Sequence, residues 1–207
     1  MAKSRKALTK VFLNIPYDKK FENLFLAYIA GISAFGLVPR ATLEISSSSR
    51  RLEKILGLIG ACRYSIHDLS RVELDSNAPR TPRFNMPFEL GLSVAYHRNL
   101  RTKKHKWFVC ESRDRRLLKS LSDLNGTDAH IHNGRIVGVF RELCNIFLPS
   151  DRKPTAQQMG KVYLRMRRSL PEILHKSGAN SVYTARVFKE LSVLAIAYAD
   201  EFVPVKT

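Results

Sequence analysis

The chain has 207 residues, of which 44% are hydrophobic and 26% are charged, values close to the averages for globular proteins. This composition excludes a wholly disordered chain, and the length suits one α/β domain with an appendage or one domain plus a small second one. No apolar run reaches the roughly 18 to 20 residues that a membrane-spanning helix requires, so we expect no association with a membrane. Residues 1–10 form a basic leader without the apolar segment of a secretory signal, which predicts a cytoplasmic protein.

The cysteines indicate a reducing compartment. Cys62, Cys110 and Cys144 lie far apart in the sequence, each within an apolar segment. We therefore expect buried free thiols rather than disulfides. Because the chain has no Cys-x-x-Cys pair, we expect no zinc site.

The net charge points to an anionic partner. The chain holds 35 Lys and Arg residues against 18 Asp and Glu residues, a net charge of +17 that is spread along its whole length. Such a field attracts anionic small molecules and polyanions, so non-specific nucleic-acid binding is one reading, with weak support from Arg165, Arg167 and Arg168. A solvated basic surface is the alternative.

Short apolar runs with strand character alternate with segments of helical spacing. We expect strands at 11–15, 37–43, 64–69, 107–110 and 128–132, and helices at 19–35, 51–62, 85–97, 113–124 and 136–147. This alternation predicts βαβ units and a flavodoxin-like, doubly wound, mostly parallel five-stranded sheet. Pro39 places its strand at the periphery of the sheet.

A linker at 149–154 separates this α/β domain, residues 11–148, from a C-terminal helical extension, residues 155–207. The extension is expected to hold helices at 155–170 and 181–200. The second helix has an apolar face that must be buried. Its partner would be the α/β domain, a second copy of the chain or a regulatory partner chain. The face comprises Val187, Phe188, Leu191, Leu194, Ala195 and Tyr198.

In a doubly wound sheet, ligands bind beyond the carboxyl ends of the strands, where the strand order reverses. Three segments that are distant in the sequence are expected to meet there. They are residues 14–18 after the first strand, 67–70 after the third, and 85–91 at the start of the following helix. Residues 71–84 hold two prolines and many charges and are expected to form a long loop, and long ordered loops are often functional.

Glu89 and Asp68 are the candidate catalytic residues. Glu89 follows the apparent start of its helix by about one turn, where the helix dipole favours a carboxylate. Such a carboxylate can attack an anomeric carbon or stabilise an oxocarbenium ion. Asp68 follows an apolar strand and can orient a ribose. The alternatives are a solvated first-turn glutamate and a loop-anchoring aspartate.

Other polar residues in these segments carry weaker predictions. Asn14 lies within an apolar strand, where it binds either a ligand or the local backbone. His67 is expected to be a packed histidine. His130 and His132 are a weak metal signal because no Cys or placed carboxylate accompanies them. The chain lacks the glycine-rich dinucleotide fingerprint, the Walker loop and the Gly-x-Ser-x-Gly motif, which argues against dehydrogenases, P-loop NTPases and α/β-hydrolases.

Together these segments resemble the nucleoside 2-deoxyribosyltransferase and TIR-like superfamily. The resemblance is carried by Val11-Phe12-Leu13-Asn14-Ile15-Pro16-Tyr17, by Asp68-Leu69-Ser70, and by Phe88-Glu89-Leu90-Gly91 with Ala95 four residues on. It implies a flavodoxin-like fold and, in many members, cleavage of the N-glycosidic bond of a nucleoside, a nucleotide or NAD. TIR-like members often act as bacterial antiphage effectors that deplete NAD.

The resemblance also assigns roles to residues. It makes Glu89 the catalytic glutamate, places Asp68 and Ser70 against the sugar, and places the loop with Asn14, Pro16 and Tyr17 beside the nucleotide. Deoxyribosyltransferases carry an acidic residue about six positions before the glutamate. Arg83 stands there in this chain, with Asn85 after it, which favours a phosphorylated substrate.

The resulting expectation is an N-glycosidase, a hydrolase or transferase, that acts on NAD or a related nucleotide. NAD would be its substrate, with no metal and no cofactor needed, and an antiphage defence effector is the role that the resemblance implies. Two alternatives from other classes stay open. One is a non-catalytic nucleotide-sensing module, and the other is a basic nucleic-acid-associated protein.

Overall fold

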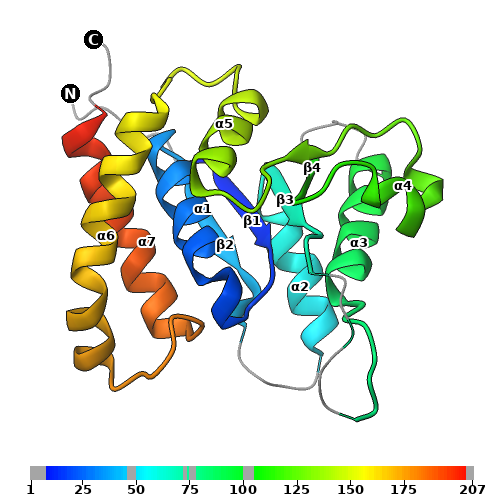
Figure 1. Ribbon diagram of the computed structural model, residues 1–207, viewed down its shortest axis with the longest axis horizontal. Helices are drawn as coiled ribbons and strands as arrows, with labels where there is room; N and C mark the ends of the chain where they lie inside the picture. The colour runs from blue at the N-terminus through cyan, green and yellow to red at the C-terminus, as the bar shows by residue number, and fades with distance from the viewer. Residues whose placement is uncertain (1–7, 46–49, 72–73, 75–77, 100–104, 204–207) are drawn as a thin grey trace.

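The computed structural model describes residues 8–45, 50–71, 74, 78–99 and 105–203 (Figure 1). Its centre is a five-stranded sheet in the order β2-β1-β3-β4-β5, and every neighbouring pair is parallel. The strands are β1 (Lys10–Asn14), β2 (Val38–Ala41), β3 (Tyr64–Asp68), β4 (Lys106–Glu111) and β5 (His130–Ile131). The predicted flavodoxin-like α/β fold is confirmed, and Pro39 lies in edge strand β2.

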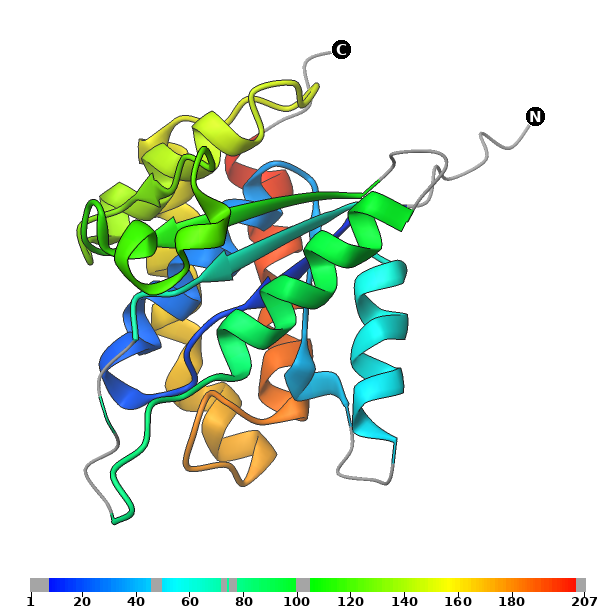
Figure 2. The same ribbon diagram turned by 90° about the vertical axis from the view of Figure 1, so that its right-hand side faces the viewer.

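Helices cover both faces of the sheet. They are α1 (Glu22–Ala34), α2 (Arg51–Gly60), α3 (Asn85–Asn99), α4 (Arg116–Ser120), α5 (Ile136–Ile146), α6 (Ala156–Ser177) and α7 (Ala185–Phe202). Helices α1 and α5 lie on one face, and α2 and α3 run side by side on the other (Figures 1 and 2). Within the described residues, no helix combines the length and the apolar character that crossing a bilayer demands.

Helix α1 is the centre of the hydrophobic core. It is covered by the sheet on one side and by α6 and α7 on the other (Figure 1). Eleven of its 13 residues are buried, which explains why its sequence is apolar all round. Gly31 permits its close approach to α5, because a Cβ there would lie 2.3 Å from Leu143 Cδ1. The apolar face of α7 packs into this core, with Val187, Phe188 and Leu191 fully buried.

Several boundaries differ from those expected. The helix predicted at 113–124 is divided into α4 and the 3-10 helix Ser122–Leu124, because Leu121 adopts a non-helical backbone with φ −139° and ψ 65°. Helix α6 runs beyond 170, through Pro171, because Ile173 continues its buried face. Helix α7 begins only at Ala185, after its N-cap Thr184. All three cysteines are free thiols, but Cys144 is only half-buried.

The packing of α7 on α1 predicts an unequal response to two matched substitutions. Leu191 of α7 is fully buried, whereas Leu164 of α6 is 54% exposed. We expect Leu191→Ala to lower the free energy of unfolding by about 3 kcal/mol, because it leaves a cavity in the core. Leu164→Ala should change it by less than about 0.5 kcal/mol. Equal, small effects in urea denaturation would show that α7 is not part of this core.

Candidate functional site

The parallel register decides which predicted residues share a side of the sheet. Asn14 pairs with His67 across β1 and β3, and both side chains face α3. Successive residues of a strand point to opposite faces, so Asp68 points toward α1 instead. The contact from Tyr28 of α1 to the Asp68 carboxylate agrees with this. Asn14 and Asp68, which the sequence analysis expects to share one crevice, therefore lie on opposite faces of the sheet.

Asn14 ties the end of β1 to the first turn of α3. Its Nδ2 donates to the backbone carbonyl of Met86 over 2.8 Å. Glu89 lies three residues after Met86, so the same helical turn carries it to the end of β1. Asn14 and Glu89 are both buried, with exposed fractions of 4% and 8%. The structure thus brings these two predicted residues together on the α3 side.

Burial controls the charge of Glu89. It raises the pKa of this carboxyl to about 7, and the nearby Arg51 guanidinium only partly opposes the rise. Glu89 is the fifth residue of α3, just beyond the first turn where the helix dipole acts most strongly, so burial outweighs any effect of the dipole on its pKa. Within the described ranges, no hydrogen bond or ion pair holds its carboxyl. Glu89 can therefore exchange a proton near neutral pH.

Tyr17 and Arg51 lie near Glu89 on this side of the sheet. The Tyr17 hydroxyl is 3.1 Å from Thr42 Oγ1, at the end of β2. Burial raises the pKa of Tyr17, and the Glu89 charge adds to the rise, so the phenol stays neutral. Arg51 begins α2 and lies near enough to affect both groups. Sequence analysis missed Arg51, although its position directly after the strand at 37–43 and a serine run was a usable signal.

The remaining predicted binding residues occupy different environments. Pro16 is buried beside the end of β1. Arg83 and Asn85 are exposed where the chain enters α3. The role of Arg83 in holding phosphate stays a prediction.

Asp68 is held by protein donors. Tyr28 Oη donates to its Oδ2 over 2.7 Å, and the Ser70 backbone N–H donates to Oδ1 over 2.9 Å. His132 Nε2 lies 3.0 Å from Oδ2. His132 Nδ1 accepts from the Gly134 N–H, so the ring proton is on Nε2 and points at Asp68. Asp68 is fully buried, and its predicted contact with a sugar stays a prediction.

Ser70, His132 and Asp68 do not form a nucleophilic triad. Ser70 Oγ lies 3.2 Å from His132 Nε2, the nitrogen that also contacts Asp68. In a triad, the serine and the aspartate contact different ring nitrogens, so that a proton can pass from one side to the other. His130 contacts Glu142 instead. In the part of the chain that the structure describes, no three potential metal ligands are grouped.

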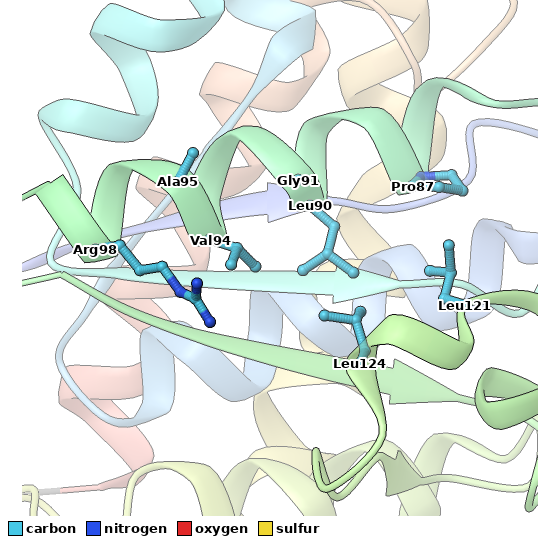
Figure 3. Close-up of a pocket in the computed structure, with 8 residues that line it drawn as sticks. All are labelled: Pro87, Leu90, Gly91, Val94, Ala95, Arg98, Leu121 and Leu124. Carbon is cyan, nitrogen blue, oxygen red and sulfur yellow. The ribbon is translucent and has the colours of Figure 1, made fainter.

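A separate apolar groove of about 340 Å³ lies on the other side of α3, against the segment after α4 (Figure 3). Its lining comprises Pro87, Leu90, Gly91, Val94, Ala95, Arg98, Leu121 and Leu124. Figure 3 shows Leu124 facing Leu90 across it. None of the predicted site residues lines this groove, and Arg98 is its one charged side chain. It therefore offers apolar contact rather than acid–base chemistry.

The buried carboxyl of Glu89 predicts a pH-dependent stability. The folded chain keeps this proton up to a pH of about 7, whereas the unfolded chain loses it near 4.5. The contribution to the free energy of unfolding is therefore greatest below 4.5 and is lost as the pH rises to about 7. The free energy of unfolding of Glu89→Gln, relative to that of wild type, should increase by on the order of 2 to 3 kcal/mol between pH 4 and pH 8. The exposed Glu53→Gln variant should show no such trend in urea denaturation, and identical trends would contradict the burial of Glu89.

The network around Asp68 predicts a stability role. Asp68→Asn presents an amide N–H₂ or a weaker acceptor to Tyr28, His132 and Ser70, so at least one buried donor loses its acceptor. We expect the free energy of unfolding to fall by about 3 kcal/mol. Asp114→Asn, at a side chain that is 77% exposed, is the control and should be neutral. A neutral Asp68→Asn would show that these contacts do not hold the strand end.

Comparisons with protein-family models, curated proteins and solved structures find no match to this chain. The chemistry of the crevice is therefore inferred from its residues and their geometry.

Proposed function

We propose that the protein is an N-glycosidase that cleaves the bond between the ribose and the nicotinamide of NAD or of a related nucleotide. Glu89 carries this proposal, because it is a buried carboxyl with no protein partner among the described residues. It lies near Tyr17 and Arg51, on the turn of α3 that Asn14 contacts, and doubly wound sheets bind ligands at such strand ends. A carboxyl that is desolvated without a compensating donor is costly to the fold, which favours a functional role.

The reaction suits such a group. When the bond from C1′ to the nicotinamide nitrogen breaks, its electron pair leaves with the base and positive charge develops on the ribosyl ring. The Glu89 carboxylate stabilises that charge or attacks C1′. Water then supplies the hydroxyl group to C1′ and loses a proton. The products are nicotinamide, the free ribosyl compound and one proton, so no redox partner is needed.

The pKa of Glu89 fits a cationic substrate. With a pKa of about 7, the carboxyl is partly protonated in the free protein at neutral pH. The positively charged pyridinium ring of NAD would lower this pKa on binding and so favour the ionised form. A neutral leaving base would instead need the protonated form as an acid. Activity on NAD should therefore rise with pH through about 7, whereas activity on a neutral base should fall.

The basic residues supply attraction to the phosphates. Arg51 lies close to Glu89, and the net charge of +17 draws an anionic nucleotide toward the protein. Tyr17, in the loop after β1, remains a neutral phenol. In this proposal Asp68 acts on the shape of the loop through Ser70.

The test measures nicotinamide release from NAD and base release from nucleoside monophosphates. Glu89→Gln should keep the fold and nucleotide binding but lower turnover by orders of magnitude, because a neutral amide neither attacks C1′ nor compensates the developing charge. Glu53→Gln, an exposed glutamate on α2, is the matched control and should retain activity. Equal activity of wild type and Glu89→Gln would refute the mechanism. Nucleotide binding without any turnover would indicate the sensing module instead.

A further inference from the structure

A chain of hydrogen bonds between buried side chains runs beneath α3, from the end of β1 to the start of β4. Asn14 Nδ2 lies 2.9 Å from His67 Nδ1, and His67 Nε2 lies 2.9 Å from Ser65 Oγ. Ser65 Oγ lies 3.1 Å from His105 Nε2, and His105 Nδ1 lies 2.8 Å from the carbonyl oxygen of Cys62. All four side chains are buried, with exposed fractions of 4% or less. These hydrogen bonds therefore run from the carboxyl end of β1 to the amino ends of β3 and β4.

Its two ends fix the position of every proton, because backbone carbonyls can only accept. The atom of Asn14 that faces the Met86 carbonyl must be the amide nitrogen, so His67 Nδ1 is an acceptor. His67 therefore carries its proton on Nε2 and donates to Ser65. At the other end, His105 donates from Nδ1 to Cys62, so its Nε2 accepts from the Ser65 hydroxyl. His67, Ser65 and His105 each donate one hydrogen bond and accept one, without conflict.

This chain of hydrogen bonds is a static support rather than a proton path. Burial lowers the pKa of His67 to about 3, and burial also lowers the pKa of His105, so both rings stay neutral at physiological pH. A relay needs a proton donor at one end and a proton acceptor that can release it at the other. Here one end is an amide N–H₂ and the other is a backbone carbonyl.

In this arrangement both hydrogens of the Asn14 amide are engaged in hydrogen bonds, and its oxygen stays available as an acceptor. One hydrogen points to Met86 and the other to His67. Among the described residues, no donor contacts Asn14 Oδ1. Asn14 ends β1 beside the turn of α3 that carries Glu89, so this acceptor is held at the candidate crevice.

We propose that Asn14 binds the ligand through Oδ1, which accepts a hydrogen bond from an O–H or N–H group, and that His67, Ser65 and His105 are positioning residues that hold the amide in this orientation. The choice of a nucleotide as the ligand rests on the proposed function. The orientation of the amide does not.

The first experiment tests the orientation in the ligand-free protein. Nitrogen NMR of the histidine rings should show His67 neutral, with Nε2 protonated and Nδ1 bare, from pH 5 to pH 8. Ser65→Ala should alter the ring signals of both His67 and His105. Ser33→Ala, which removes an equally buried hydroxyl without a hydrogen-bond partner, should leave them unchanged. A His67 ring protonated on Nδ1 would overturn the assignment, as would signals that ignore Ser65→Ala.

The second experiment tests ligand recognition by calorimetry, in the Glu89→Gln background so that the probe is not consumed. The probes are nicotinamide mononucleotide, its 2′-deoxy and 3′-deoxy forms, and the pyridinium analogue without the carboxamide. Loss of the donor that Asn14 recognises should weaken binding about three- to tenfold. The probe that binds more weakly than nicotinamide mononucleotide identifies either a sugar hydroxyl or the base amide as that donor.

The same probes separate positioning from general stability. Adding Asn14→Ala should abolish the discrimination, and adding Ser65→Ala should reduce it, whereas adding Ser33→Ala should leave it intact. Equal binding of all four probes, or discrimination that survives Asn14→Ala, would overturn the role of Asn14. Failure of every probe to bind would overturn the nucleotide ligand and the proposed function together, while the NMR result would still decide the orientation of the amide.

Discussion

The pairing of Asn14 with His67 across β1 and β3 is the constraint on which the candidate site depends. Because side chains alternate along a strand, this register directs Asn14 and His67 toward α3 and Asp68 toward α1. A slip of one residue would exchange these environments. Asn14 would lose Met86, and Asp68 would lose Tyr28. The register therefore fixes both the position of Asn14 beside α3 and the hydrogen bonds of Asp68 on the opposite face.

The buried carboxyl groups on the two faces of the sheet differ in their hydrogen-bond partners. Asp68 has no exposed surface, yet both of its oxygens receive hydrogen bonds from Tyr28, Ser70 and His132. Glu89 is also buried, but only the charge of the nearby Arg51 favours its ionised form. Burial with donors stabilises a carboxylate, whereas burial without them raises its pKa. The first arrangement is typical of a structural support, and the second is typical of a group that exchanges protons.

The sequence supported the sheet, its strand order and the meeting of Asn14 with Glu89, because these follow from alternating elements and from the ends of strands. It did not show that Asp68 lies on the other face, since Asn14 and Asp68 both simply end short apolar strands. Nor did it show that Glu89 is buried, because burial follows from the packing of α3 against β1 and α2, which are distant in sequence. The chain of hydrogen bonds through Ser65 and His105 could not be predicted, because its residues are spread over three segments of the sequence.

The C-terminal helices bear on the site through α1 and the loop after β1. Tyr183, just before α7, donates to the Asp18 carbonyl, and its ring packs on Tyr17 with centroids 5.6 Å apart. The residue that borders Glu89 is thus held partly by the extension. Without α6 and α7, helix α1 would be exposed on the side that faces away from the sheet, and Tyr17 would lose its contact with Tyr183. The extension therefore contributes to the geometry of the crevice as well as to the core.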